Sequence, residues 1–223
     1  DTEAGQVEVR DHEHGRTVRI PYDQLVIATG ARPRRPEIPG INGEAVLGVQ
    51  TLADAQRLLE RAERANPKDV VVVGGGYIGL EMAESFVRRG SHVTIVEGAP
   101  EIMGTLDPDM ATMVRAAMVR TGIDVRCGAP VRAFEPGAVH LEGGETVAAD
   151  MVVLGLGVDP NTELAGDAGV ELGVKGAVRV NSRQQASVDG IWAAGDCCES
   201  HHLVTRQPVH IALGTVANRQ ARV

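Results

Sequence analysis

Aromatic residues and cysteines are scarce in this sequence, and each shortage excludes a class of protein. Only 2% of the 223 residues are aromatic, so the 43% hydrophobic residues that can form a core are mainly valine, leucine, isoleucine and alanine. Three cysteines, two of them adjacent, do not make a disulfide framework. Such a composition is typical of a protein in the reducing cytoplasm.

Basic residues and long hydrophobic runs are also lacking. The formal net charge is −8, which argues against binding to nucleic acid or to an anionic membrane surface. No apolar run approaches the roughly 20 residues that a membrane-spanning helix needs. The first residues, DTEAGQVEVR, do not resemble a signal peptide. We therefore expect a cytoplasmic protein without a nucleic-acid or membrane partner.

The chain is organised around residues 69–97, DVVVVGGGYIGLEMAESFVRRGSHVTIVE. Four consecutive valines predict a strand that is buried on both faces. Ile78, Met82 and Phe86 then recur at helical spacing and predict the buried face of a helix. Residues 92–96 predict a second strand, so the stretch has the order strand, helix, strand.

The glycines that follow the first strand have the G-x-G-x-x-G spacing of a dinucleotide-binding β-α-β unit. Gly74 permits the tight turn, Gly76 lets the backbone approach a diphosphate, and Gly79 lets the helix pack closely against the strand. The helix then begins at Tyr77, where free N–H groups and the helix dipole favour phosphate. A glycine-rich turn of some other α/β protein is the alternative interpretation.

An acidic residue at the end of the second strand indicates which dinucleotide is preferred. Glu97 lies 18 positions after Gly79, close to the ~20-residue spacing of a ribose-binding acid. Its carboxylate can accept hydrogen bonds from the ribose hydroxyls of NAD and repels a 2′-phosphate. Residues 98–101, GAPE, supply no arginine or lysine for that phosphate. The sequence predicts that NADH is preferred over NADPH.

The remaining patterns predict an α/β fold in which an antiparallel meander is attached to a parallel sheet. Alternating residues up to Ile20 predict a hairpin, and Thr51 with Asp54 predicts a capped helix that ends near Ala65. Asp107 and Pro108 can start another helix. The further expected elements are strands at 25–28, 123–127, 131–134, 138–141, 145–154, 178–180 and 191–193, and a helix at 210–222.

Short buried strands also run into turns of small residues, which let a backbone approach a flat or phosphorylated ligand closely. These turns are Ala28-Thr29-Gly30, Gly155-Leu156-Gly157 and Ala194-Gly195-Asp196.

Four stretches together resemble the pyridine nucleotide-disulfide oxidoreductases, the FAD-dependent, glutathione reductase-like flavoproteins. They are YDQLVIATGARPRRPEIPGI, VVVVGGGYIGLEMAESF, VVLGLGVDPNTELA and IWAAGDCCE, and they span nearly the whole chain. Two further stretches, GTLDPDMATMVRAAMVRTGIDV and LVTRQPVHIALGTVANRQARV, are similar to CoA-disulfide reductases and NADH oxidases. Ferredoxin reductases and the flavin module of nitrite reductases share the glycine motifs and are the alternative branches.

The resemblance implies a Rossmann-like NAD-binding domain at 51–158, flanked by parts of an FAD-binding domain at 1–50 and 159–223. It implies that hydride passes from NADH through FAD to a disulfide or persulfide such as CoA disulfide, or to oxygen. Tyr77 would stand at the nicotinamide pocket, Glu81 would face the junction of nicotinamide and flavin or lie on a solvated helix face, and Asp196 would bind the ribityl chain. The residues expected to bind NAD or FAD are Gly74, Gly76, Tyr77, Ile78, Gly79, Glu81, Glu97, Gly157, Ala28, Thr29, Gly30, Gly195 and Asp196.

Several parts of the family pattern are not found in this chain. No second G-x-G-x-x-G precedes Gly74, and the family's redox cysteine and C-terminal dimerisation domain have no counterpart. The chain therefore resembles an internal fragment of a longer enzyme, which would be a homodimer, and we expect no catalytic residue within it. An NADH-binding sensor module without turnover is the non-enzymatic alternative.

The segment DCCESHH gathers metal-ligand residue types without the separated pairs of a zinc site. We therefore expect no metal. Cys197 and Cys198 lack the C-x-x-C spacing of a redox pair, and Cys127 is expected in the core.

The absence of a second dinucleotide fingerprint generates a direct prediction. Purified residues 1–223 should be colourless and should not oxidise NADH, because the site for the ADP half of FAD would be incomplete. A visible absorbance spectrum and an NADH oxidation assay test this. Yellow, active protein would contradict it.

Overall fold

The computed structural model describes residues 1–223, which form two compact units. One unit is continuous and consists of Pro33–Gly157, and the other combines Asp1–Arg32 with Val158–Val223. The continuous unit begins before residue 51 because strand β5 (Val46–Gly48) pairs with strand β12 (Met151–Leu154) in its sheet.

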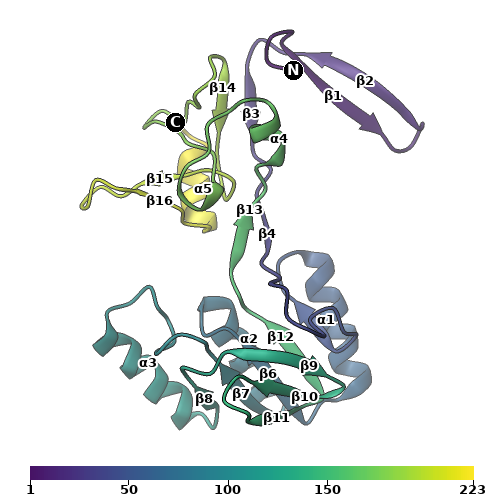
Figure 1. The fold of residues 1–223 in the computed structure, drawn as a ribbon, viewed down its shortest axis with the longest axis vertical. Helices are drawn as coiled ribbons and strands as arrows, with labels where there is room; N and C mark the ends of the chain where they lie inside the picture. Colours follow the sequence, from purple (N-terminus) through teal and green to yellow (C-terminus); the bar gives the residue numbers. More distant parts are fainter. The chain divides into compact units, whose positions relative to one another are not determined.

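A five-stranded parallel sheet forms the centre of the continuous unit, which confirms the expected α/β class (Figure 1). The strands lie in the order β5, β12, β6, β7, β8, and every neighbouring pair is parallel. The remaining three strands are β6 (Asp69–Val73), β7 (His92–Val96) and β8 (Asp124–Arg126).

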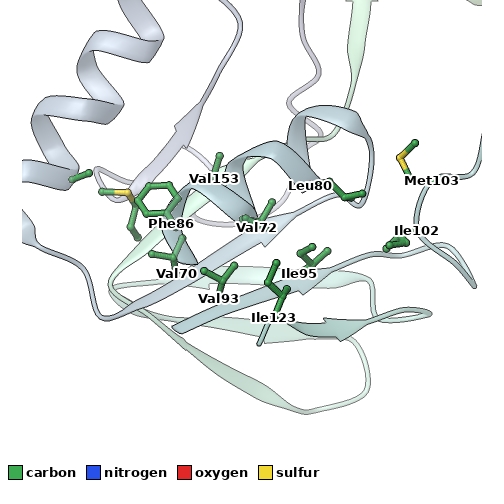
Figure 2. Close-up of a cluster of buried hydrophobic side chains, with 13 residues drawn as sticks. Val70, Val72, Leu80, Phe86, Val93, Ile95, Ile102, Met103, Ile123 and Val153 are labelled. Atoms are coloured by element: carbon green, nitrogen blue, oxygen red, sulfur yellow. The ribbon is translucent and has the colours of Figure 1, made fainter. Parts of the chain in front are cut away.

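The four valines of β6 are buried on both faces of this sheet, as the sequence predicts. Val70 and Val72 belong to a cluster that includes residues of the helices, and Figure 2 shows this cluster. Val71 and Val73 belong to a second cluster, together with residues of the antiparallel strands. The unit therefore has three layers, with the helices α1 (Leu52–Ala65), α2 (Tyr77–Arg88) and α3 (Pro108–Arg120) on one face and the meander on the other.

The antiparallel layer is a meander in the order β11, β10, β9. The run expected as one strand over 145–154 is broken at Asp150, whose carboxylate accepts the N–H groups of Lys68 at 2.8 Å and Asp69 at 3.1 Å. These amides, with that of Asp69 first, lower the pKa of Asp150. The break sends β12 into the parallel sheet and leaves the meander with β9 (Val131–Glu135), β10 (Gly137–Leu141) and β11 (Thr146–Ala149).

Helix α2 buries part of the face expected for it. Phe86 is buried and Met82 packs half-buried against the same cluster, as predicted, whereas Ile78 is exposed at 37%. The other buried residues of the helix are Gly79, Leu80 and Ala83. The periodicity is misleading at position 78 because the first turn faces the core through its neighbours Gly79 and Leu80.

The discontinuous unit is assembled from short strands. The expected hairpin is confirmed as β1 (Gln6–Asp11) and β2 (Arg16–Pro21). Strand β3 (Leu25–Ile27) runs parallel to β14 (Ile191–Ala193), and both contribute to a small core with Val178, Cys197 and Cys198. The other elements are β4 (Ala31–Pro33) paired with β13 (Val158–Pro160), α4 (Glu163–Asp167), the 3₁₀ turn Val174–Gly176, and β15 (Ser200–His201) paired with β16 (Pro208–Val209).

Two expectations for this unit are wrong. Residues 178–180 do not form a strand, since only Val178 makes isolated bridges, to Leu172 and Cys198. The expected helix over 210–222 is confined to α5 (Gly214–Gln220). The preceding residues are extended because residues 208–209 pair with β15, and the His210 ring bonds to the Asp196 carbonyl at 2.8 Å.

No helix in the chain is both long enough and apolar enough to cross a bilayer.

The start of α1 has the predicted capping box. The Thr51 hydroxyl accepts the Asp54 N–H at 3.1 Å, and the Asp54 carboxylate accepts the Thr51 N–H at 2.9 Å. The Thr51 amide, the Thr51 hydroxyl and Arg57 lower the pKa of Asp54 to about 2.

Substitution Thr51→Ala should lower the free energy of unfolding by about 1 kcal/mol at neutral pH, because the first-turn amide loses its acceptor. A depressed carboxyl pKa stabilises the fold above the unfolded-state value of 3.8 and ceases to do so as the pH falls toward 2. The difference between wild type and Thr51→Ala should therefore shrink near pH 2. Urea denaturation at both pH values measures this, and an unchanged difference would contradict it.

Candidate functional site

The turn between β6 and α2 depends on a glycine with left-handed backbone. Gly74 has φ +104°, and its N–H bonds to the carbonyl of Val96 at 2.8 Å. A Cβ on Gly74 would collide with the carbonyl group of Gly155, which directly follows β12. The position therefore requires glycine for its backbone angle and for the close approach of a second strand end.

Close packing at this turn continues into the helix. A Cβ on Gly79 would collide with the carbonyl oxygen of Gly74, and a Cβ on Gly155 would lie 3.2 Å from the Cα of Gly79. Three glycines from β6, α2 and the end of β12 thus lie in mutual van der Waals contact. The sequence assigns this packing role to Gly79 but gives no indication that Gly155 is its partner.

The amino end of α2 is open. Gly76 is the N-cap residue, no side chain caps the helix, and a Cβ on Gly76 would meet nothing within 4 Å. The backbone at the start of the helix can therefore be approached closely by a ligand. A diphosphate fits this arrangement, since amide donors and the positive end of the helix dipole favour an anion.

Glu97 lies beside the glycine turn. Its Oε2 accepts the N–H of Gly75 at 2.7 Å, and its Oε1 accepts the N–H of Ala99 at 2.8 Å. These two bonds leave each carboxylate oxygen with capacity for another donor, because an ionised carboxylate has about four acceptor sites. The half-buried carboxylate is thus fixed at the mouth of the turn rather than extended into solvent.

A loop that sequence reasoning missed packs against this turn. The N–H of Met103, which has φ +50°, bonds to the Gly75 carbonyl at 2.8 Å. A Cβ on Gly75 would collide with the fully buried Ile102. The sequence holds one signal for this contact. Gly75 is the middle glycine of the G-G-G run, and the G-x-G-x-x-G spacing does not require a glycine there.

The side chains expected near the nicotinamide lie on the open part of α2. Tyr77 is 52% exposed, and its hydroxyl lies 3.3 Å from that of Thr105. Ile78 and Glu81 are also exposed.

In the discontinuous unit, two of the expected turns follow the parallel strands β3 and β14, so both lie at carboxyl ends. Thr29 bonds to Asn161 in both directions: its hydroxyl donates to the Asn161 carbonyl, and its carbonyl accepts the Asn161 side-chain amide at 3.0 Å. Ala28 and Thr29 are exposed, and Gly30 has φ +68°. Gly157, with φ +80°, belongs to the continuous unit instead.

The second turn holds Gly195 and Asp196. Gly195 has φ +87°, and its N–H bonds to the side chain of Gln220 at 2.9 Å. The Asp196 carbonyl is held by His210, whereas the half-buried Asp196 carboxylate has no hydrogen-bond partner within the chain. Backbone fixed on both sides of an unpaired carboxylate fits a ligand with hydroxyl donors, such as a flavin nucleotide.

Cysteine and histidine residues do not assemble a metal centre, since no group of three or more potential ligands occurs. Cys197 and Cys198 are buried free thiols. The Cys198 thiol lowers the pKa of Cys197, helped by the Gly30 amide and the Thr29 hydroxyl and opposed by burial. The same interaction and burial raise the pKa of Cys198. Cys127 is half-buried. Its pKa is raised mainly by burial and, to a smaller extent, by the neighbouring Glu101 carboxylate.

Comparison with known proteins places this geometry in context. The sequence pattern of the family "Pyridine nucleotide-disulphide oxidoreductase" matches residues 1–221. An NADH oxidase of Methanocaldococcus jannaschii is 39% identical over 94% of this chain and 47% of its own length. A CoA-dependent NAD(P)H sulfur oxidoreductase of Pyrococcus furiosus is 36% identical over 100% of this chain and 51% of its own length. The chain thus spans about half the length of these relatives.

Solved structures of similar proteins have the same fold as this chain. The reduced CoADR-RHD protein of Bacillus anthracis superposes with a TM-score of 0.95 at 34% identity, covering 100% of this chain and 40% of that protein. An engineered water-forming NADPH oxidase bound to NADPH has a TM-score of 0.92 at 29% identity, covering 99% of this chain and 49% of that protein. In that engineered protein a glycine was replaced by alanine, and an aspartate 18 positions after it was also replaced by alanine. The residue directly after the aspartate was replaced by arginine. Gly79 and Glu97 have the same separation.

The contact between Gly74 and Gly155 generates a prediction about stability. Substitution Gly74→Ala should lower the free energy of unfolding by about 3 kcal/mol or more, because backbone strain adds to a collision with fixed backbone. Urea denaturation of residues 1–223 measures the effect.

Gly90→Ala is the matched control, since Gly90 has φ +88° and a Cβ there would meet nothing within 4 Å. That variant should lose only about 1–2 kcal/mol, the cost of left-handed backbone. Equal losses in the two variants would contradict the role of close packing.

Proposed function

The chain belongs to the pyridine nucleotide-disulphide oxidoreductase family, and from this we propose that it supplies the NADH-binding part of a flavin-dependent NADH oxidoreductase. The diphosphate of NADH would lie on the amino end of α2, beside Gly76. The adenosine ribose would bond to Glu97. The observation that carries this proposal is the Glu97 carboxylate held at 2.7 Å from the Gly75 N–H, next to uncapped helix amides.

The preference for NADH rests on charge. Glu97 places a carboxylate where a 2′-phosphate would add two negative charges, and Gly98 and Ala99 offer no cation. The engineered NADPH oxidase supports this assignment, because an acid at the equivalent spacing was removed and an arginine was introduced beside it.

Bound FAD would supply the redox chemistry, accepting hydride from NADH and passing electrons to a disulfide, a persulfide or oxygen. The chain's own residues would bind and orient the two nucleotides. Tyr77 would cover the nicotinamide and exclude water, and Glu81, one turn later on α2, would face the junction of the two rings. Ala28, Thr29, Gly30, Gly195 and Asp196 would hold the flavin nucleotide, with the Asp196 carboxylate accepting ribityl hydroxyl groups, and Gly157 would line the return from the NADH-binding part.

The electron acceptor would be determined by the longer protein, about twice the length of this chain as in its relatives. The names of the relatives support either oxygen or a CoA-linked sulfur substrate, as NADH oxidase and CoA-dependent sulfur oxidoreductase. We propose that this longer enzyme is a cytoplasmic homodimer, in which residues 51–158 belong to the NAD-binding domain and residues 1–50 and 159–223 to parts of the FAD-binding domain, except that strand β5 joins the NAD-binding sheet.

Titration of NADH and NADPH into the protein, followed by fluorescence or calorimetry, tests the role of Glu97. NADH should bind at least tenfold more tightly, a difference of about 1.4 kcal/mol. In the double variant Glu97→Ala, Gly98→Arg this preference should fall or invert, because repulsion of the 2′-phosphate is replaced by attraction.

The control is Glu63→Ala, which removes an exposed acid of α1 in the same unit. It should leave the ratio of the two affinities unchanged. Tighter binding of NADPH by the wild-type protein would refute the assignment of Glu97.

A further inference from the structure

Gln220 is a buried polar residue for which the proposed function gives no role. It is the last residue of α5, is only 8% exposed, and lies at the opposite end of the discontinuous unit's sequence from β3. A buried amide requires partners for its oxygen and its nitrogen, so its contacts show what it holds in place.

The amide of Gln220 spans the segment that follows β14. Its Oε1 accepts the N–H of Gly195 at 2.9 Å, and its Nε2 donates to the Glu199 carbonyl at 3.0 Å and to the Ser200 hydroxyl at 3.1 Å. The orientation of the amide is fixed by these partners, because a backbone N–H can only donate and a carbonyl can only accept. One side chain thereby joins both ends of the segment 195–200.

Asp196 lies inside the segment that Gln220 closes. Its carbonyl is held by the ring of His210 at 2.8 Å, and the Cys198 N–H bonds to the Gly195 carbonyl at 3.1 Å. The Asp196 carboxylate has no hydrogen-bond partner in the chain. The backbone that carries it is therefore fixed before any ligand binds.

We propose that Gln220 is a positioning residue for FAD, which it serves by fixing the turn that presents the Asp196 carboxylate. This inference rests on the proposed function, in which Asp196 contacts the flavin nucleotide. Gln220 itself touches no ligand. Its contribution is preorganisation: without it, the Gly195 N–H and the Glu199 carbonyl lose their partner, and the turn must be ordered when FAD binds.

The test uses the full-length holoprotein and three variants whose FAD affinity is measured by titrating apoprotein with FAD and following flavin fluorescence. Gln220→Met keeps the length of the side chain and removes its hydrogen bonds, and it should raise the Kd for FAD about tenfold. Gln220→Glu keeps length and shape but places an acceptor against the Glu199 carbonyl, and it should also weaken FAD. Asn218→Met changes an exposed residue of the same helix and should leave the Kd unchanged.

Two further measurements separate positioning from a general loss of stability. The thermal midpoint of each apoprotein reports folding, and NADH affinity reports the continuous unit. A folded Gln220→Met variant should bind NADH as the wild type does while losing FAD affinity. If Gln220→Met does not fold, the isosteric Gln220→Glu variant decides the question.

Asp196→Ala distinguishes failure of this inference from failure of the proposed function. If Asp196→Ala weakens FAD and the folded Gln220 variants bind FAD within twofold of wild type, the positioning role is overturned and the flavin role of Asp196 stands. If Asp196→Ala leaves FAD affinity unchanged, the proposed flavin contact fails, and with it the reason for the positioning role.

Discussion

The contact among Gly74, Gly79 and Gly155 is the constraint on which the candidate NADH site depends. It lets helix α2 approach the ends of β6 and β12 to backbone contact, which larger side chains would prevent. The amino end of the helix consequently lies at the carboxyl edge of the sheet, where ligands bind in open α/β folds. Only in this arrangement does the Gly75 N–H come within 2.7 Å of Glu97 at the end of the neighbouring strand β7. The backbone of this glycine turn therefore serves both the packing of the fold and the proposed binding of NADH.

Local signals in the sequence are sufficient for the central β-α-β unit, for this turn and for the start of α1. The run of valines predicted a strand buried on both faces, the glycine spacing predicted the turn, and the pair Thr51 and Asp54 predicted the helix cap. Each of these depends on neighbours within one element or on one β-α-β unit. The position of Glu97 could be predicted for the same reason, since the lengths of α2 and β7 determine where the chain returns to the turn.

What the sequence could not provide depends on partners distant in the chain. Ile78 has the periodicity of a buried residue, but the first turn of α2 buries Gly79 and Leu80 and leaves Ile78 exposed. The final helix is shorter than its pattern indicates because the ring of His210 forms a hydrogen bond with the carbonyl of Asp196. Gly155 has the local signature of a small-residue turn, but nothing near it in the sequence indicates its contacts with Gly74 and Gly79. The role of Gln220 is likewise defined by backbone groups that lie about 20 residues or more earlier.

The discontinuous unit has a consequence for the order of folding. Strand β3 must wait for β14, and residues 33–157 are synthesised between them. Closing so long an unfolded loop has an entropic cost, but a folded insert joins its own ends, as the bond of 2.9 Å from the Arg34 N–H to the Gly157 carbonyl shows. All five strands of the central sheet lie within residues 33–157, so this sheet can form before β14 is synthesised. A continuous unit that folds first would hold the ends of its segment together and shorten the loop that β3 and β14 must close.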